Sequence, residues 1–438
     1  MILLAAFLIF MATVICALIF DYSLIIALLA GLVCFMAVGL RQGHSFKSLC
    51  RMGADGNRDS MIVIEVMLII GFLTASWRIS GTVTIFVYYG IKVITPPLFL
   101  IVAFALSCLL SYALGTSFGV AGTVGVIFMT LARSGGVDPV ITAGVLMSGI
   151  YFGDRCSPVS SSANLVAAVT GSDILGNVKA MMKTALLPLI LTVIIYTVVS
   201  VMNPITGVSP ELLGMFETEF SLSLWAFIPA VLMVLLPLLK INILISMGVS
   251  IVSAIVIAWL VQDIPLLQVL RTCVMGYEAS GDGLATLLNG GGMVSMLEIV
   301  VILLISCCYS GIFSGTGMLN ALQDRLSSAC TRFSRFVIMI IISIASSACF
   351  CNQTIATLMC NDLLKKPYLD GGGPAEELAI DMENSVILIA CMIPWSIGCS
   401  VPLGFFDIGP AAVLCAFYMW LVPICYLFTK KKWYKEKP

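Results

Sequence analysis

A polar segment, GDRCSPVSSSAN at residues 153–164, interrupts an apolar run from 139 to 170. It places an acid and a base, Asp154 and Arg155, next to each other and just before Pro158. Ionisable groups within an apolar span cost several kcal/mol unless they are paired or hydrated, and they usually belong to functional sites. Irregular backbone at membrane depth is tolerated only beside a cavity or inside protein. The stretch therefore predicts a membrane-spanning helix that is broken at a polar site.

The composition outside this stretch is that of an integral membrane protein. Of 438 residues, 60% are apolar and 10% are charged, and the mean hydropathy is +1.11. Soluble domains average about half apolar and a quarter charged residues. A net charge of −1 gives no case for nucleic acid. The 16 cysteines lie mostly in apolar runs, and His44 is the only histidine. We therefore expect packing cysteines rather than disulfides or zinc.

Apolar runs of about 20 residues predict about ten spans in an all-α bundle. We place them at 2–20, 23–40, 61–78, 139–170, 180–202, 223–239, 242–262, 297–313, 378–408 and 409–429. The first run carries no cleavage motif, so we interpret it as a span rather than a signal peptide. Two more stretches, 98–132 and 336–364, are interrupted by polar residues at 115–117 and 352–354. They predict two re-entrant hairpins, and residues 79–95 predict a helix along the surface.

Short motifs recur between the two halves of the chain. The sequence ISGT at 79–82 returns as FSGT at 313–316, MG at 52–53 as 275–276, and CS at 156–157 as 399–400. Five spans and one hairpin per half make the two repeats inverted, because five is odd. We therefore divide the chain into a first repeat (1–202), an acidic extracellular linker (203–222) and a second repeat (223–438). The broken spans 139–170 and 378–408 then meet near the midplane.

The distribution of basic residues predicts the orientation. With both termini in the cytoplasm, most lysines and arginines fall in cytoplasmic loops and in the tail 430–437, as the positive-inside rule requires. The linker carries Glu211, Glu217 and Glu219 and no basic residue, and it falls outside. We expect a multi-pass protein of the cytoplasmic (inner) membrane, with the lipid bilayer as its surroundings.

Broken helices of inverted repeats that meet at the midplane are how many secondary transporters build a site. In the first broken span, side-chain oxygens suited to a cation or a polar solute come from Ser157, Ser160, Ser161 and Asn164, beside Asp154. Arg155 is either part of this site or a structural partner of Asp154. Three other carboxylates are candidates with plain alternatives. Glu65 and Asp407 are possible proton carriers, and Glu383 is a candidate for the cation site. Asp407 and Glu383 lie near span ends, where either could instead simply be hydrated.

The segment 149–160, GIYFGDRCSPVS, closely resembles the signature of the NhaC family of Na+/H+ antiporters, in the wider ion-transporter superfamily. GTSFG at 115–119, MENS at 382–385 and IPW at 393–395 are similar to further family motifs. The resemblance implies Na+ as the transported or coupling ion, bound near Asp154, Ser157 and Asn164. It also implies an elevator-type motion, often in a homodimer. Further residues implied at the site are Thr116, Ser117, Gln353, Thr354, Trp395 and Ser396.

Three departures from the family pattern keep a second function open. Ser161, Ser396 and Asn384 stand where the family has aspartate, asparagine and aspartate. Antiport is simplest when Na+ and protons compete for a carboxylate, which leaves Asp154 with Glu383 or Glu65. The alternative is a Na+-coupled symporter or exchanger of a small amino acid or carboxylate, with Arg155 binding the substrate carboxylate. A channel or an intramembrane enzyme is less favoured, and no organic cofactor is expected.

Overall fold

The computed structural model describes residues 2–20, 22–58, 61–93, 96–204, 210–239, 241–279, 288–317, 334–370 and 372–433. Within these ranges the chain is almost entirely helical, and the only strand-like pairing is an isolated bridge between Tyr277 and Gly290. The prediction of an all-α protein is confirmed.

The first half of the chain contains twelve labelled α-helices and two short irregular turns of helix. They are α1 (Ile2–Ile19), α2 (Leu24–Arg41), α3 (Phe46–Arg58), α4 (Met61–Ile79), α5 (Thr82–Val93), η1 (Pro96–Leu98), α6 (Phe99–Leu114), α7 (Ser117–Val120), the π-helix η2 (Ala121–Gly125), α8 (Val126–Ser134), α9 (Pro139–Cys156), α10 (Ser161–Thr170), α11 (Ile174–Met202) and α12 (Pro210–Glu219). The last of these lies in the predicted linker.

The second half repeats much of this order. Its elements are η3 (Leu224–Phe227), α13 (Ile228–Leu238), α14 (Ile243–Leu260), α15 (Leu266–Met275), η4 (Val294–Met296), α17 (Leu297–Thr316), α19 (Arg335–Phe350), α20 (Gln353–Asp370), α21 (Ala375–Glu383), α22 (Val386–Ile389), α23 (Ile397–Phe406), η5 (Pro410–Cys415) and α24 (Phe417–Trp433).

Four of the described helical stretches are long and apolar enough to cross a membrane: Leu24–Arg41, Ser117–Ser134, Ile174–Met202 and Val294–Phe313. Eight shorter apolar helices of 10–17 residues accompany them. Two expectations need correction. The helix predicted at 180–202 begins at Ile174, because Asp173 caps its first turn by accepting a hydrogen bond from the Gly176 amide. The second arm of the first predicted hairpin is a continuous stretch of 18 residues rather than a segment too short to span.

Many large apolar side chains lie on the outside of the molecule. On α2 and α11, Val33 is 68% exposed and Ile194 is 54% exposed. A soluble monomer rarely exposes contiguous apolar patches larger than a few hundred Å². A surface of this kind is suited to lipid, as expected of a membrane protein.

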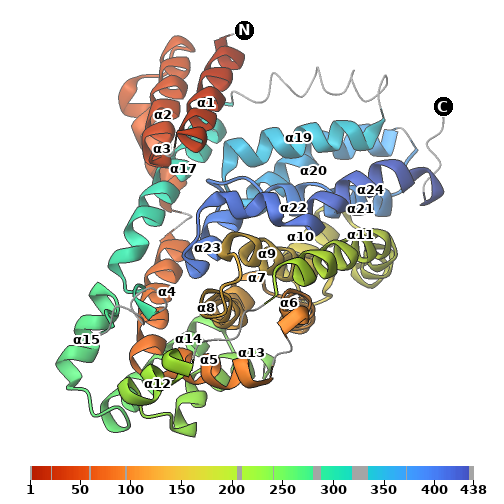
Figure 1. The fold of residues 1–438 in the computed structure, drawn as a ribbon. Helices are drawn as coiled ribbons and strands as arrows, with labels where there is room; N and C mark the ends of the chain where they lie inside the picture. Colours follow the sequence, from red (N-terminus) through yellow and green to blue (C-terminus); the bar gives the residue numbers. More distant parts are fainter. Residues whose placement is uncertain are drawn as a thin grey trace.

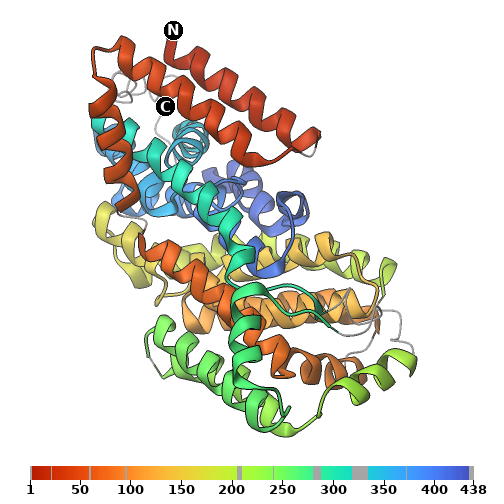
Figure 2. The ribbon, with the colours of Figure 1, turned by 90° about the vertical axis from the view of Figure 1, so that its left-hand side faces the viewer.

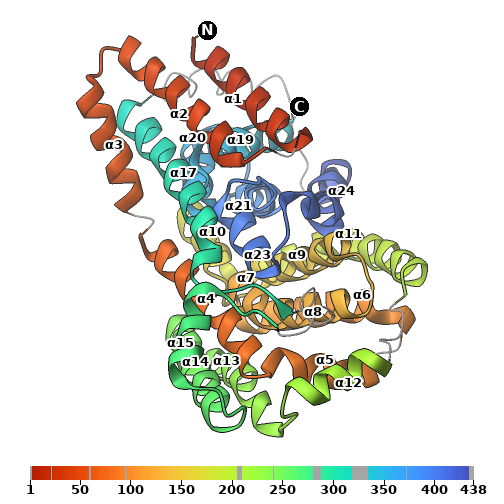
Figure 3. The same cartoon turned by 60° about the vertical axis from the view of Figure 1, so that its left-hand side comes forward.

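The helices of the two halves are exchanged between two bundles at opposite ends of the molecule (Figure 1). In one bundle, α2 and α3 of the first half pack against α17 of the second half. In the other, α14 and α15 of the second half pack against α4 of the first half. The same two bundles stand apart in the side view of Figure 2, and Figure 3 shows α17 running from one towards the other. The broken helices lie between the two bundles.

The helices break where the polar interruptions predicted. Between α6 and α7, Gly115 adopts φ +64°, and a Cβ at this residue would lie 2.7 Å from the main-chain carbon of Val159. Only glycine fits both the left-handed conformation and this approach. The corresponding residue between α19 and α20 is Cys351, with φ +55°, and its carbonyl accepts a 2.8 Å hydrogen bond from the Ile397 amide. Each break in a predicted hairpin thus contacts the break of the neighbouring spanning helix.

Candidate functional site

Asp154 lies in the last turn of α9 and is 4% exposed. Its carboxylate accepts hydrogen bonds of 3.3 Å from the Ser160 hydroxyl and of 3.3 Å from the Gln353 side-chain amide. Its main-chain carbonyl accepts another, also 3.3 Å, from Ser162. All three donors are uncharged, so the charge of an ionised Asp154 is not cancelled by a bound cationic side chain.

Two helices begin beside this carboxylate. Ser160 is the N-cap of α10, and Gln353 is the first residue of α20. The first turn of a helix presents unpaired N–H groups and the positive end of the helix dipole. Two such ends stabilise a negative charge in a buried position. The chain leaves α9 in extended conformation at Ser157, because Pro158 disfavours a helical residue before it.

Arg155 is fully buried but does not pair with Asp154. In the described part of the chain its guanidinium makes no ion pair within 4.0 Å. Its hydrogen bonds go to the carbonyl of Glu383 (3.1 Å), the side-chain oxygen of Asn384 (2.5 Å), the hydroxyls of Thr184 (2.9 Å) and Tyr418 (3.0 Å), the sulfur of Cys156 (3.3 Å) and the carbonyl of Met181 (3.4 Å). An arginine has five N–H groups, so these acceptors occupy all of them. Arg155 joins α9 to the break between α21 and α22.

Glu383 ends α21 at this break and is completely buried. Neither of its carboxylate oxygens has a hydrogen-bond partner among the described residues. The carboxyl group interacts electrostatically with Arg155 and Asp154. A buried carboxyl without a donor is costly, which makes it a position for a proton or a bound cation.

Several predicted residues line the same region. Ser117 is buried, and Thr116 caps α7 by accepting a 3.4 Å hydrogen bond from the Gly119 amide. Ser396 is fully buried before α23, and its hydroxyl has no partner among the described residues. Trp395 instead holds the end of α19, donating a 2.9 Å hydrogen bond to the Ala348 carbonyl.

Other predicted residues do not join Asp154. Ser161, Asn164 and Thr354 are exposed, and the Asn164 amide bonds carbonyls of its own segment at 3.0 and 2.7 Å. Glu65 is exposed near the start of α4. Asp407 is the C-cap of α23, with a side chain that is 69% exposed and 3.8 Å from Arg133. The exposure of Asp407 favours its interpretation as a hydrated carboxylate.

Sequence reasoning missed a buried ionic cluster. Lys430, counted among the cytoplasmic tail residues, is 3% exposed and lies 2.5 Å from Asp381 and 2.9 Å from Glu377. Tyr368 and Tyr426 donate to the same Asp381 carboxylate at 2.5 and 2.9 Å. The cluster ties α20, α21 and α24 together. A carboxylate inside the apolar start of a predicted span, Asp381, could have indicated a buried ion pair. Its partner Lys430 is 49 residues further along the chain, so the sequence did not identify the pair.

Residues 149–429 match the model of the Na+/H+ antiporter family. The chain belongs to this family. The match includes both the segment 149–160, on which the resemblance rested, and the second broken helix at α21–α23. The chain is accordingly a secondary transporter, and the family prediction is confirmed.

Three relatives of this antiporter-family chain illustrate the range of transported solutes. It is 27% identical over 437 residues to the malate-2H(+)/Na(+)-lactate antiporter of Bacillus subtilis (strain 168), covering 95% of this chain and 92% of that protein. It is 27% identical over 391 residues to an uncharacterized Na(+)/H(+) antiporter of Haemophilus influenzae, covering 85% and 84%. It is 24% identical over 350 residues to the Na(+)/H(+) antiporter NhaC of Alkalihalophilus pseudofirmus, covering 78% and 76%.

Proposed function

We propose that this protein exchanges Na+ for protons across the cytoplasmic membrane, with Asp154 as the carboxylate for which the two cations compete. The observation that carries the proposal is the environment of Asp154. Its side chain is buried at the meeting point of two helix starts and accepts hydrogen bonds from the uncharged side chains of Ser160 and Gln353. Because Arg155 is turned away to other acceptors, the carboxylate charge is available to a cation.

Chemically, the site offers hard oxygen ligands, which alkali cations prefer. Carboxylate oxygens of Asp154 and hydroxyl oxygens of Ser157 and Ser160 are the ligands that would hold Na+. Glu383 interacts electrostatically with Asp154, and no hydrogen-bond donor reaches its carboxylate within the described part of the chain. It would carry the exchanged proton or balance the charge as Na+ leaves. A ligand carboxylate must lose its proton to bind a cation, so binding one ion releases the other.

The finer architecture follows as part of the proposal. The exchange of α3 onto α17 and of α15 onto α4 supports two inverted repeats over 1–202 and 223–438, joined by the linker 203–222. The contacts of Gly115 with Val159 and of Cys351 with Ile397 support two re-entrant hairpins whose tips meet the broken helices. We extend this to an elevator-type motion of the hairpin and broken-helix unit, in a homodimer with both termini in the cytoplasm.

A carboxylate exchanger remains the second candidate, because one relative is named for malate and lactate. Arg155 was the predicted ligand of a substrate carboxylate. Its N–H groups are all engaged by protein acceptors, so binding a substrate would require breaking several of these bonds. The arrangement therefore favours the bare cation exchange.

The test is transport in proteoliposomes that contain a trapped pH dye. A Na+ pulse is given alone, and then again with a mixture of amino acids and dicarboxylic and hydroxy acids. Proton movement on Na+ alone, abolished in Asp154→Asn, is the expected result. Silence until an organic acid is added would replace the proposal with the carboxylate exchanger.

A further inference from the structure

Polar side chains occur at every fourth residue over most of α20 and form a row along the helix. Its members are Gln353, Thr357, Asn361 and Lys365. Residues four apart form one of the ridges of a helix surface. Thr357 is fully buried and Asn361 is 7% exposed. The row therefore lies largely inside the protein.

One member of the row lacks the partner that a buried amide normally has. The side-chain oxygen of Asn361 has no hydrogen-bond partner among the described residues, and its amide nitrogen reaches only Asp362, at 3.5 Å. The Thr357 hydroxyl bonds the Gln353 carbonyl at 2.7 Å, within the same helix. Apolar residues at these positions would make the folded protein more stable, because an unpaired buried polar group lowers its stability.

The two ends of the row are fixed by contacts with other helices. At one end, the Gln353 amide lies 3.3 Å from the Asp154 carboxylate. At the other end, the Lys365 ammonium donates a 2.7 Å hydrogen bond to the Val169 carbonyl, near the end of α10. The helix α10 also begins beside Asp154, through its N-cap Ser160. The helices α10 and α20 contact each other and run side by side away from the site. Twelve residues of α20 span about 18 Å at 1.5 Å per residue.

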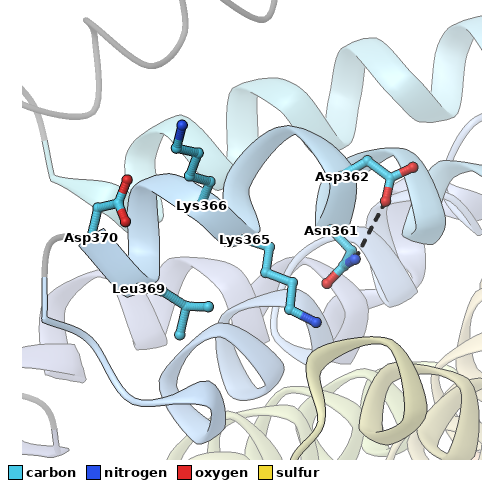
Figure 4. Close-up of a pocket in the computed structure, with 6 residues that line it drawn as sticks. All are labelled: Asn361, Asp362, Lys365, Lys366, Leu369 and Asp370. Carbon is cyan, nitrogen blue, oxygen red and sulfur yellow. Dashed lines mark hydrogen bonds between the residues drawn. The ribbon is translucent and has the colours of Figure 1, made fainter.

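An open pocket of about 560 Å³ lies at the far end of the row. Figure 4 shows its lining side chains, Asn361, Asp362, Lys365, Lys366, Leu369 and Asp370. Asn361 and Lys365 point to one side of α20, whereas Asp362 and Lys366 point to the other. Two acidic and two basic residues line the pocket. The formal charges that line the pocket therefore sum to zero. The Lys365 ammonium lies at the C-terminus of α10, where the helix dipole favours a positive charge.

The opposite approach to the site is closed by tight packing. A Cβ added at Gly122 would lie 2.5 Å from the Phe405 ring, and one at Gly125 would lie 2.4 Å from the Phe406 ring. Arg133 of α8 also donates a 2.8 Å hydrogen bond to the Phe406 carbonyl. The interface of α8 and η2 with α23 is therefore closely packed and is held by the hydrogen bond from Arg133.

We infer that cations reach Asp154 from the pocket at Lys365, along the row Gln353, Thr357 and Asn361, while Phe405 and Phe406 close the other side. The inference rests on the proposed function for the identity of the ions. Lys365 and Lys366 mark the pocket side as cytoplasmic by the positive-inside rule. Neutral oxygens spaced along the row stabilise a passing cation without trapping it.

The inference is tested with Thr357→Val and Asn361→Leu. The matched control is Thr192→Val on α11, because Thr192 is also fully buried and bonds the carbonyl four residues earlier, at 2.8 Å. Initial rates of radioactive Na+ uptake are measured against Na+ concentration in inside-out and right-side-out vesicles. For both variants kcat/KM for Na+ offered at the cytoplasmic face should fall at least about fivefold, with less than about twofold change at the opposite face. The control should change neither.

A second measurement separates access from binding and from folding. The half-saturating Na+ concentration for thermal stabilisation of the purified protein should stay unchanged in both variants, whereas Asp154→Asn should lose the effect. Equal losses of kcat/KM at both faces, or a shift in the half-saturating Na+ concentration, would overturn the access path. So would wild-type kinetics in both variants. If the wild-type protein shows no Na+ effect at all, the proposed function fails instead.

Discussion

Replacing Arg155 by lysine is the most informative single change to the framework of the site. The guanidinium uses five N–H groups on protein acceptors, and an ammonium group offers three. The six protein acceptors of Arg155 would then share three N–H groups in place of five, so at least two hydrogen bonds are lost. A hydrogen bond to a charged group contributes about 1.5–3 kcal/mol, so Arg155→Lys should destabilise the protein by about 3 kcal/mol.

The assay is unfolding of the purified protein in mixed micelles by increasing denaturing detergent, together with Na+ transport. A loss of about 3 kcal/mol lowers the ratio of folded to unfolded protein roughly 100-fold. Transport should lose kcat more than Na+ affinity, because Arg155 holds the α21–α22 break and does not touch the cation site. The control is Arg271→Lys, since Arg271 is exposed on α15.

Wild-type stability in Arg155→Lys would refute the account of the buried network. A selective loss of affinity for an organic acid, with folding intact, would instead return Arg155 to the role of a substrate ligand.

Three further predictions follow from other contacts. Glu383→Gln cannot exchange a proton, so Na+ uptake should persist while its coupling to proton movement weakens; unchanged coupling in the dye assay would exclude Glu383. Lys430→Met leaves Asp381 without its cationic partner, whereas Glu377 keeps Arg335 at 3.6 Å, and the change should cost about 3–5 kcal/mol. Replacement of the exposed neighbouring lysine, Lys431→Met, should leave stability unchanged in the same unfolding assay. Gly125→Ala forces a Cβ against Phe406 and should cost about 1–3 kcal/mol, whereas Gly248→Ala, with open space around it, should be neutral or stabilising; equal effects would contradict the tight seal.

The helix breaks could be predicted from the sequence because their causes are local. Pro158 and the polar run that follows it end α9, and Gly115 supplies the conformation that ends α6. The contact of Asp154 with Ser160 has a local cause as well, because the two residues are six apart. The other local hydroxyl contact comes from Ser162, whereas the sequence had suggested Ser161, which is exposed. Cys351 was harder to place, because a left-handed cysteine carries no sequence signal comparable to glycine.

The partners of the buried charges could not be predicted, because they come from distant segments. Arg155 meets Glu383 and Tyr418, which are 228 and 263 residues away. Because Arg155 follows Asp154 directly in the sequence, the two residues were candidates for a local ion pair. Neighbouring residues on a helix point to different sides, however, so the two side chains do not meet. Lys430 looked like one of several tail lysines, and only the packing of α24 on α21 buries it.

Competition of Na+ and protons for Asp154 can be measured as the apparent KM for Na+ at a series of pH values. If Na+ and one proton compete for the buried carboxylate at Asp154, the apparent KM for Na+ should rise about tenfold for each unit by which the pH is lowered in the acid range. The maximal rate should stay unchanged. Asp154→Asn should abolish Na+-dependent transport while keeping the folded state. An apparent KM that is independent of pH, or near-normal transport in Asp154→Asn, would contradict the account.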